Sequence, residues 1–340
     1  MTTDFKSLIA LVADGKSLDE KQAETAFDIM MSGDATPSQI GGFLMALRVR
    51  GESVDEITGA CRAMRAKALR VKAPDNAIDI VGTGGSGLHT YNVSTAASIV
   101  LAGCGQPVAK HGNRAASSKS GTADAFSILG IDLDTEFENI EKAAYEANLC
   151  FLMAPRHHGA MRNVGPTRVE LGTRTIFNIL GPLSNPAFVK RIMCGAFSRD
   201  WIVPMAVTLG NVGTDVAWVA HGSDGMDEIT TTGPTYIAEL RNGHVREFEI
   251  TPADAGLPIA NLDDLRGGTP IENAAKITTL LAGEIGPFRD IVLMNAAAAL
   301  VIADKADNLK EGVGIAAQSI DSEAAKAALS KLVEIVGFKK

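Results

Sequence analysis

The first seventy residues carry apolar side chains at the spacing of α-helices. Apolar positions recur three or four residues apart, as expected for one face of a helix, at Ile40, Phe43, Leu44, Leu47, Ile57, Cys61 and Met64. Capping boxes, in which Ser or Thr precedes Glu or Gln by three positions, mark helix starts at Ser17 with Glu20, Thr36 with Gln39, and Ser53 with Glu56. We predict a small helical bundle whose apolar faces support a dimer.

Beyond Pro74, short apolar runs alternate with helical segments. Strands are predicted at residues 77–81, 107–110, 149–153, 191–197 and 215–220, followed by a hairpin of 236–240 with 245–250. Helices are predicted between them at residues 94–103 and 124–129. Such alternation is typical of a mostly parallel sheet with helices on both faces. The predicted class is therefore α/β, with a small all-helical domain and a large α/β domain.

Two more helical regions complete the predicted architecture. Residues 163–180 look helical and are expected to return to the N-terminal bundle. A capping box at Thr269 and Glu272 opens a helical tail, with two more helices expected between Phe288 and Val336. The predicted helical domain is residues 1–72 with a returning segment at about 163–182, and the α/β domain is residues 75–160 and 186–340.

Composition narrows the possible partners. Forty acidic and 32 basic side chains give a net charge of −8, which argues against a protein that mainly binds nucleic acid or an anionic membrane. The four cysteines form no CxxC pair, so neither a disulfide framework nor a zinc knuckle is expected. There is no signal-peptide core, and the apolar run at residues 291–303 is shorter than the roughly 20 residues that cross a bilayer. We expect a cytoplasmic protein.

A glycine-rich loop follows the first predicted strand. Gly82, Gly84 and Gly87 fit the pattern GxGxxG, and glycines let backbone amides approach phosphate oxygens closely. A dinucleotide site would need an acidic residue at the end of the second strand, where Lys110 and His111 stand. A Walker A loop is excluded, since no Gly-Lys-Ser/Thr follows. A glycine turn without any ligand is the remaining alternative.

Two further segments suit anion binding. Residues 92–95, Asn-Val-Ser-Thr, open a helix, whose N-terminal amides favour phosphate, although Ser94 or Thr95 would also serve as an ordinary N-cap. Lys110, Arg114 and Lys119 fall in one segment at the end of the second strand, where they resemble a polyanion clamp. The alternative is a solvated basic loop.

Carboxylates and arginines supply the other candidate groups. Asp227 and Glu228 follow a predicted strand, and two carboxylates can bind hydrated Mg²⁺ together with substrate phosphates. By itself such a pair is usually a solvated turn. Among Arg162, Arg168 and Arg174 in the returning segment, one can pair with a substrate carboxylate, or all can form surface salt bridges. Neither a GxSxG motif nor a Cys–His signature is present, which fits a reaction without a covalent intermediate.

Taken together, these motifs resemble the anthranilate phosphoribosyltransferase family. The likeness rests, in family order, on residues 82–85 (GTGG), 92–95 (NVST), 110–114 (KHGNR), 117–121 (SSKSG), 157–158 (HH), 174–186 (RTIFNILGPLSNP) and 227–228 (DE). It runs from about the first helix to the last. It implies a helical domain hinged to an α/β domain, a homodimer, and transfer of phosphoribosyl from phosphoribosyl pyrophosphate to anthranilate with Mg²⁺, in tryptophan biosynthesis.

The resemblance also implies roles for individual residues. Phosphoribosyl pyrophosphate would be bound by Gly82, Gly85, Ser86, Thr90, Asn92, Val93, Ser94, Thr95, Lys110, His111, Gly112, Asn113, Arg114, Ala115, Ala116, Ser117, Ser118 and Thr122. Anthranilate would be bound by Gly82, Asn113, His158 and Arg168, with Arg168 facing its carboxylate. Mg²⁺ would be bound by Ser94, Asp227 and Glu228, and catalysis would depend on Lys110, Asn113 and Arg168.

The chain departs from the family pattern at two positions, and two other functions compete. Ser86 stands where the family usually has Asp, and Gly159 where Pro is frequent. The missing carboxylate is expected to alter the handling of Mg²⁺, and Gly159 to loosen the substrate entrance. A pyrimidine-nucleoside phosphorylase would share the fold and the glycine loop, but residues 110–114 have the transferase form. A non-catalytic nucleic-acid-binding paralogue would need a basic surface.

Overall fold

The computed structural model describes residues 4–114 and 120–338, and its larger part is built on one seven-stranded sheet in the order β3-β2-β1-β4-β5-β6-β7. β1 to β5 are parallel, while β6 and β7 form an antiparallel hairpin at one edge. The strands are β1 (Ile78–Gly82), β2 (Val108–Gly112), β3 (Leu149–Met153), β4 (Arg191–Gly195), β5 (Val216–Gly222), β6 (Thr235–Arg241) and β7 (His244–Ile250). The predicted α/β class and the hairpin are confirmed.

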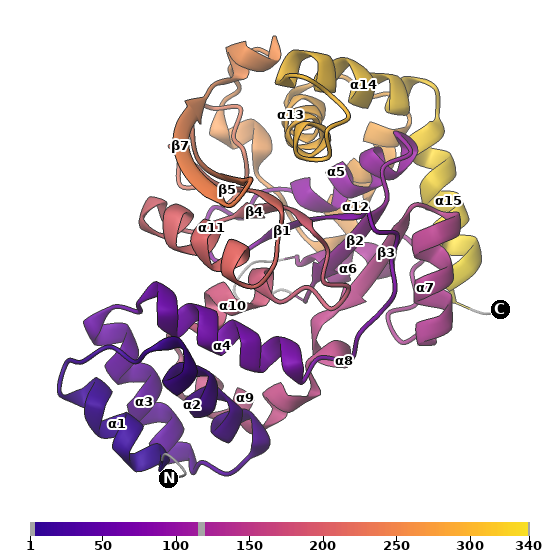
Figure 1. Ribbon diagram of the computed structural model, residues 1–340. Helices are drawn as coiled ribbons and strands as arrows, with labels where there is room; N and C mark the ends of the chain where they lie inside the picture. The colour runs from indigo at the N-terminus through magenta and orange to yellow at the C-terminus, as the bar shows by residue number, and fades with distance from the viewer. Residues whose placement is uncertain (1–3, 115–119, 339–340) are drawn as a thin grey trace.

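Helices cover both faces of the sheet (Figure 1). α5 (Val93–Gly103) and α13 (Pro287–Ile302) pack against one face, and α11 (Ile202–Asn211) against β5 and β6 on the other. Near the β3 edge, α7 (Phe137–Glu146) packs against α15 (Ala324–Val336). The remaining elements of this part are α6 (Thr122–Ile128), α8 (Ala154–His157), α12 (Pro270–Leu281), α14 (Leu309–Asp321), and short 3-10 turns at Arg199–Trp201, Pro252–Ala255 and Leu262–Leu265.

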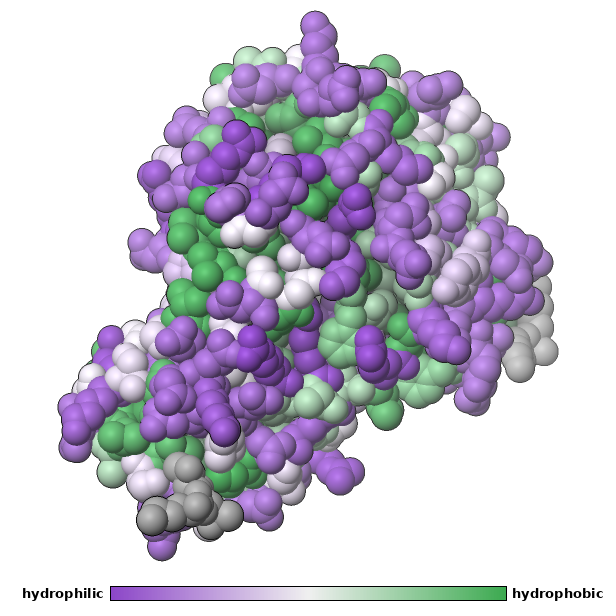
Figure 2. All heavy atoms as spheres, viewed as in Figure 1, coloured by the Kyte–Doolittle hydropathy of each residue, from purple (hydrophilic) through white to green (hydrophobic). Residues whose placement is uncertain are grey.

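A smaller helical unit lies at the lower left of Figure 1, and Figure 2 shows the outline narrowing between it and the larger part. It contains α1 (Phe5–Ala13), α2 (Glu20–Ser32), α3 (Pro37–Arg50) and α4 (Val54–Ala66). The chain returns to it through a 3-10 turn at Gly159–Asn163, α9 (Gly165–Leu171) and α10 (Phe177–Leu183). α9 packs on α3 and α10 on α4, and Asn163 Nδ2 donates to the carbonyl of Met31 at 2.7 Å.

Several sequence-based expectations need correction. The first helix start is Asp19 paired with Gln22, not Ser17 with Glu20, because Asp19 is the residue in extended conformation just before α2. Two helices were expected after Phe288, but α13, α14 and α15 are three, because the left-handed Glu323 separates α14 from α15. The helices α7 and α11 were missed, and the returning segment is two helices separated at Gly172, whose φ is 58°.

The capping boxes at the starts of α3, α4 and α12 are confirmed. In each, the N-cap hydroxyl accepts the amide three residues on, and the Glu or Gln side chain there accepts the N-cap amide. Such caps satisfy amides that have no partner within the helix. These short-range bonds depend only on neighbouring residues, so the pattern could be recognised without the fold.

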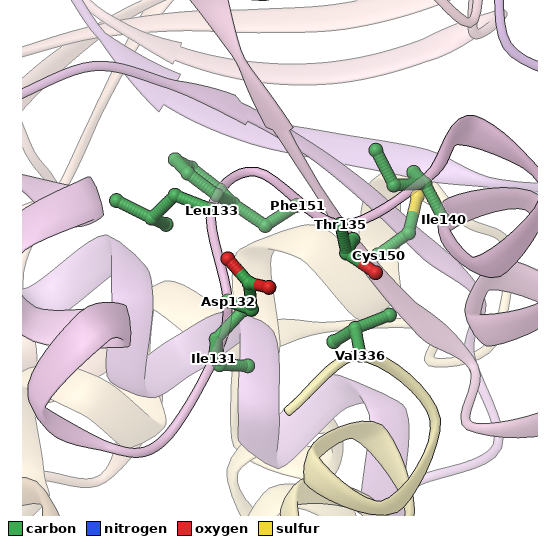
Figure 3. A pocket seen from close by; sticks show the side chains of 8 residues that line it. All are labelled: Ile131, Asp132, Leu133, Thr135, Ile140, Cys150, Phe151 and Val336. Atoms are coloured by element: carbon green, nitrogen blue, oxygen red, sulfur yellow. The ribbon is translucent and has the colours of Figure 1, made fainter. Parts of the chain in front are cut away.

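Residues 336 and 337, at the end of α15, pack beside β3. Ile131 and Gly337 form an isolated bridge, and Val336 lies beside Cys150 and Phe151 around a cavity of about 10 Å³ (Figure 3). A cavity of that size admits at most a single water molecule, so it is a packing gap and not a substrate pocket. Within the described ranges, no helix is long and apolar enough to span a bilayer.

Arg65 joins the helical unit to the larger part. From α4, its Nε donates to the carbonyl of Leu183 at 2.9 Å and its Nη1 to that of Val212 at 2.8 Å. These carbonyls lie at the C-terminal ends of α10 and α11, where backbone acceptors lack partners within the helix and a cation is favoured. One guanidinium therefore caps two helices and fixes α4 against both.

We expect Arg65→Met to lower the free energy of unfolding by about 2–3 kcal/mol, because charged hydrogen bonds to two carbonyls are lost. The matched control is Arg62→Met, one turn away, whose side chain is 42% exposed and bonds Glu20 and the Asn211 carbonyl. That change should cost less than about 1 kcal/mol. Urea denaturation followed by circular dichroism measures both, and equal losses would contradict the assigned role of Arg65.

Candidate active site

The candidate site lies at the carboxyl edge of the central strands. From β1 the chain proceeds to β2 and β3 on one side, while β4 and β5 lie on the other. In open parallel sheets, ligands bind where the strand order reverses in this way, outside the carboxyl ends. The glycine loop follows β1, the 110–114 segment ends β2, and the acidic pair follows β5. The topology therefore brings three sequence-predicted segments to one edge.

The glycine loop and the acidic pair meet directly. The amide of Gly84 donates to Asp227 Oδ2 at 2.7 Å, and Ser86 also hydrogen-bonds the Asp227 side chain. A Cβ on Gly82 would lie 2.7 Å from Asp227 Oδ2, so a side chain at position 82 would displace this carboxylate. Gly84 itself has φ of 68°, in the left-handed region that favours glycine. Gly82 and Gly84 thus allow the Asp227 carboxylate to lie directly against the backbone of the loop.

The acidic pair has the character of an incomplete metal site. Burial raises the pKa of both Asp227 and Glu228, and for Glu228 the charges of Asp227 and Asp224 add to the effect. Glu228 Oε2 is buried and has no hydrogen-bond partner among the described residues. The same part of the chain holds no group of three or more His, Cys, Asp or Glu side chains suited to a metal. Two carboxylates awaiting phosphate and water ligands are typical of Mg²⁺, so these residues fit it.

Lys110 is buried below the same edge, with 1% of its surface exposed. Its Nζ donates to the Ile80 carbonyl at 2.5 Å and to Ser94 Oγ at 3.2 Å. Burial lowers the pKa of Lys110 to about 8, while Asp79 and Glu228 oppose that change electrostatically. The structure therefore brings Lys110 together with two of the three residues expected to hold Mg²⁺.

The N-terminus of α5 points its amides at the site without a side-chain cap. α5 begins at Val93, and the preceding Asn92 makes no capping bond, so neither Ser94 nor Thr95 is the N-cap. Asn92 Oδ1 instead accepts from Asn273 Nδ2 at 2.8 Å and from Ser120 Oγ at 3.0 Å. Asn273, on α12, was not predicted from the sequence, because nothing in its local pattern signals a partner 181 residues away.

The segment after β2 is described only as far as Arg114. Asn113 is exposed, and its carbonyl accepts the amide of Ala123 in α6. Arg114 pairs with Asp124 at 3.0 Å, and Thr122 lies next to Gly112 at the start of α6. Lys110 is buried within β2, so it does not share an exposed clamp with Arg114. Of the predicted residues, Ala115, Ala116, Ser117, Ser118 and Lys119 lie outside the described ranges.

A second group of predicted residues lies toward the helical unit. The rings of His111 and His158 are 5.2 Å apart, and burial lowers the pKa of both, that of His158 to about 4, so both are neutral near pH 7. On α9, the Arg168 guanidinium lies 5.3 Å over the Phe177 ring, and burial lowers its pKa. No carboxylate of the described chain pairs with Arg168. A half-buried cation without a counterion is suited to an anionic ligand.

Arg174 lies between the helical unit and the glycine loop. Its Nη2 donates to the carbonyl of Gly85, and its guanidinium lies 4.3 Å from the Phe197 ring centroid. Arg48 of α3 in turn donates to the Arg174 carbonyl and to Thr173 Oγ1. Arg174 is one of the three arginines of which one is expected to pair with a substrate carboxylate, and its side chain connects the helical unit to the glycine loop.

Comparison with known proteins places the whole chain in one family. Residues 74–326 match the model of the glycosyl transferase family, a/b domain, and residues 6–68 that of its helical bundle domain. The chain is 60% identical over 332 residues to anthranilate phosphoribosyltransferase of Rhodopseudomonas palustris strain HaA2, covering 98% of each chain. It is 59% identical over 337 residues to the protein of that name from Parvibaculum lavamentivorans, covering 99% of each.

Solved structures agree over nearly the full length. The anthranilate phosphoribosyltransferase of Thermus thermophilus superposes with a TM-score of 0.92 at 41% identity, covering 97% of this chain and 99% of that one. The Saccharomyces cerevisiae enzyme in complex with PRPP and Mg gives 0.90 at 29% identity, covering 98% and 99%. Sequence, fold and the edge of the sheet described above lead to one conclusion: the chain belongs to the anthranilate phosphoribosyltransferase family.

Proposed function

We propose that this protein transfers the phosphoribosyl group of 5-phosphoribosyl 1-pyrophosphate to the amine of anthranilate, releasing pyrophosphate, in tryptophan biosynthesis and in the cytoplasm. The observation that carries the proposal is the meeting of Gly84 with Asp227 and of Lys110 with Ser94 at one edge of the sheet. Relatives at about 60% identity bear this enzyme's name, and the yeast enzyme has been solved with PRPP and Mg and with 4-fluoroanthranilate.

The donor is bound mainly by backbone amides and one buried cation in this proposal. The diphosphate lies against the glycine loop and the uncapped N-terminus of α5, where amides and the helix dipole favour negative charge. Ser94, Asp227 and Glu228 would hold Mg²⁺, which when bound neutralises charge that develops on the departing diphosphate. Lys110 places a positive charge beside Ser94, and Asn113 and His111 border the ribose end.

The acceptor is oriented from the helical side. Arg168 binds the anthranilate carboxylate, and the neutral His158 and His111 rings border the aromatic ring. As the bond between ribose and diphosphate breaks, the anthranilate amine forms the new bond to the same carbon and then loses a proton to the released diphosphate or to solvent water. Because that amine is weakly basic and already carries its lone pair, the chain's task is to position it.

Arg168→Ala should lower kcat/KM for anthranilate by roughly 30-fold or more, as expected when one partner of a desolvated ion pair is removed. Binding of phosphoribosyl pyrophosphate with Mg²⁺, measured by calorimetry, should stay within about threefold of the parent. The control is Arg162→Ala, an exposed arginine of the preceding 3-10 turn, which should change neither. Anthranilate fluorescence loss reports turnover, and failure of the parent protein to consume anthranilate would overturn the proposed function.

Ser86→Asp should lower the Mg²⁺ concentration for half-maximal activity by severalfold, because it adds a carboxylate beside Asp227, which Ser86 now hydrogen-bonds. Ser86→Asn is the matched control, since it has the size of Asp without its charge. Activity against Mg²⁺ concentration, together with Mg²⁺ binding in the presence of pyrophosphate, measures the effect. An unaltered Mg²⁺ profile for Ser86→Asp would show that Ser86 does not lie near the metal.

We also propose a homodimer formed through the helical unit, which we assign to residues 1–72 with 163–182. In support, Val49 on α3 is 82% exposed and Val169 on the neighbouring α9 is 81% exposed, which is unusual for such side chains. The double change Val49→Asp with Val169→Asp should convert a dimer to a monomer in light scattering at low micromolar concentration. Ile285→Asp, an equally exposed position of the larger part, is the control.

A further inference from the structure

The backbone pairing between β1 and β2 stops after a single pair. Ile78 pairs with Val108, whereas β1 with β4, and β2 with β3, pair over five consecutive positions. Both strands lie wholly within the described part of the chain. The strands that lead into the glycine loop and into residues 110–114 therefore lose their direct pairing before they reach the site.

A continued parallel ladder would make two more hydrogen bonds between these strands. Given the existing bond from the Ile78 amide to the Pro107 carbonyl, the next bond donated by β1 would join the Ile80 amide to the Ala109 carbonyl. The following one would join the His111 amide to the Ile80 carbonyl. Because these groups are buried, each needs another partner once the ladder stops.

Side chains supply partners for three of these four groups, the His111 amide and the carbonyls of Ala109 and Ile80. The His111 amide donates to Asp79 Oδ1 at 3.1 Å, and the Ala109 carbonyl accepts from Asn185 Nδ2 at 2.8 Å. The Ile80 carbonyl of β1 accepts instead from Lys110 Nζ. The gap between the strands is thus closed by a seam of three side chains, Asp79, Lys110 and Asn185.

Asp79 and Asn185 are bonded to each other at the centre of this seam. Asn185 Nδ2 donates to Asp79 Oδ2 at 2.7 Å, and both side chains have 0% exposure. Burial raises the pKa of Asp79 to about 6, although the positive charge of Lys110 and the hydrogen bond from Asn185 both act to lower it. Asn185 follows α10 by two residues, on the segment that leads from the helical unit back to β4, and its Oδ1 accepts the amide of Ala187.

We propose that the Asp79–Asn185 pair is a positioning unit, which holds the ends of β1 and β2 at the separation that admits a sugar diphosphate between the glycine loop and residues 110–114. Both side chains are fully buried, so we assign them no contact with substrate. Because Asn185 lies between α10 and β4, the pair also links the spacing of these strand ends to the segment that joins the helical unit to the larger part. The choice of ligand rests on the proposed function, whereas the seam itself does not.

The kinetic test is Asn185→Leu, which keeps the branched shape of the side chain and removes both donated hydrogen bonds. We expect kcat/KM for phosphoribosyl pyrophosphate to fall about 10- to 100-fold with a raised KM, because small displacements of binding groups have effects of this size. KM for anthranilate should stay within about threefold. A residue that only stabilises the fold would lower the yield of active enzyme without moving either KM.

The matched control is Gln106→Leu. Gln106 is a buried amide at the opposite end of the same two strands, where its Nε2 donates to the carbonyls of Asn76 and Pro107. This change removes two comparable hydrogen bonds and should leave both KM values unchanged. A similar rise in the KM for phosphoribosyl pyrophosphate in Gln106→Leu would overturn the positioning role.

Hydrogen exchange of the His111 amide tests the seam without turnover. In Asn185→Leu we expect this amide to exchange at least about tenfold faster than in the parent, and the amides of β4 to be unchanged. If Asn185→Leu does not fold, Asp79→Asn decides. This change keeps an acceptor for the His111 amide, but it opposes two NH₂ groups at the pair and should therefore raise the KM for phosphoribosyl pyrophosphate. Unchanged exchange and an unchanged KM in the folded variant would overturn the proposal. If the parent protein is inactive but the His111 amide exchanges faster in the variant, the result would contradict the proposed function and still support the structural role of the Asp79–Asn185 pair.

Discussion

A buried lysine between two strand ends is the constraint on which the site depends. Lys110 can remain within the sheet only because the Ile80 carbonyl, Ser94 and the nearby acidic groups compensate for its lost hydration. The same contacts place a positive charge beside the residues that fit Mg²⁺. If Lys110 were exposed, its charge would be screened by water and would contribute little to a developing negative charge. The contacts that keep Lys110 buried are therefore the same contacts on which its proposed chemistry depends.

The acidic side of the site shows the complementary feature. Glu228 has a buried oxygen without a partner in the described chain, and Asp227 is held by the Gly84 amide and Ser86. Leaving a buried carboxylate oxygen unpaired is unfavourable for folding, so its retention points to a ligand. Ser86 gives Asp227 a neutral hydrogen-bond donor at the position where the resemblance described above implies a carboxylate.

Local patterns predicted much of the fold. Strand positions, the hairpin of β6 and β7, and the caps of α3, α4 and α12 depend on neighbouring residues and could be recognised in the sequence. The first cap was misplaced because Ser17 and Asp19 both suit the role, and only the backbone shows that Asp19 takes it. The number of helices after Phe288 was underestimated, since the break at Glu323 carries no Gly or Pro.

Motifs indicated candidate site residues, but they did not show how deeply each one is buried or which residues it contacts. Lys110 and Arg114 are four residues apart, yet one is buried in a strand and the other pairs with Asp124. The roles of Asn273, Arg174 and Asn185 depend on contacts across 89 to 181 residues, which no local spacing signals. The seam between β1 and β2 could not be predicted for the same reason, because residues typical of strands gave no sign that pairing would stop.

The most direct test of this account is a crystal structure of the protein soaked with phosphoribosyl pyrophosphate and Mg²⁺. The account predicts the diphosphate against the glycine loop and the amides of α5, with a metal ion on Asp227 and Glu228 and the Lys110 ammonium still buried beside Ser94. A ligand bound elsewhere, or glycine-loop and β2 segments that turn away from a bound diphosphate, would contradict it.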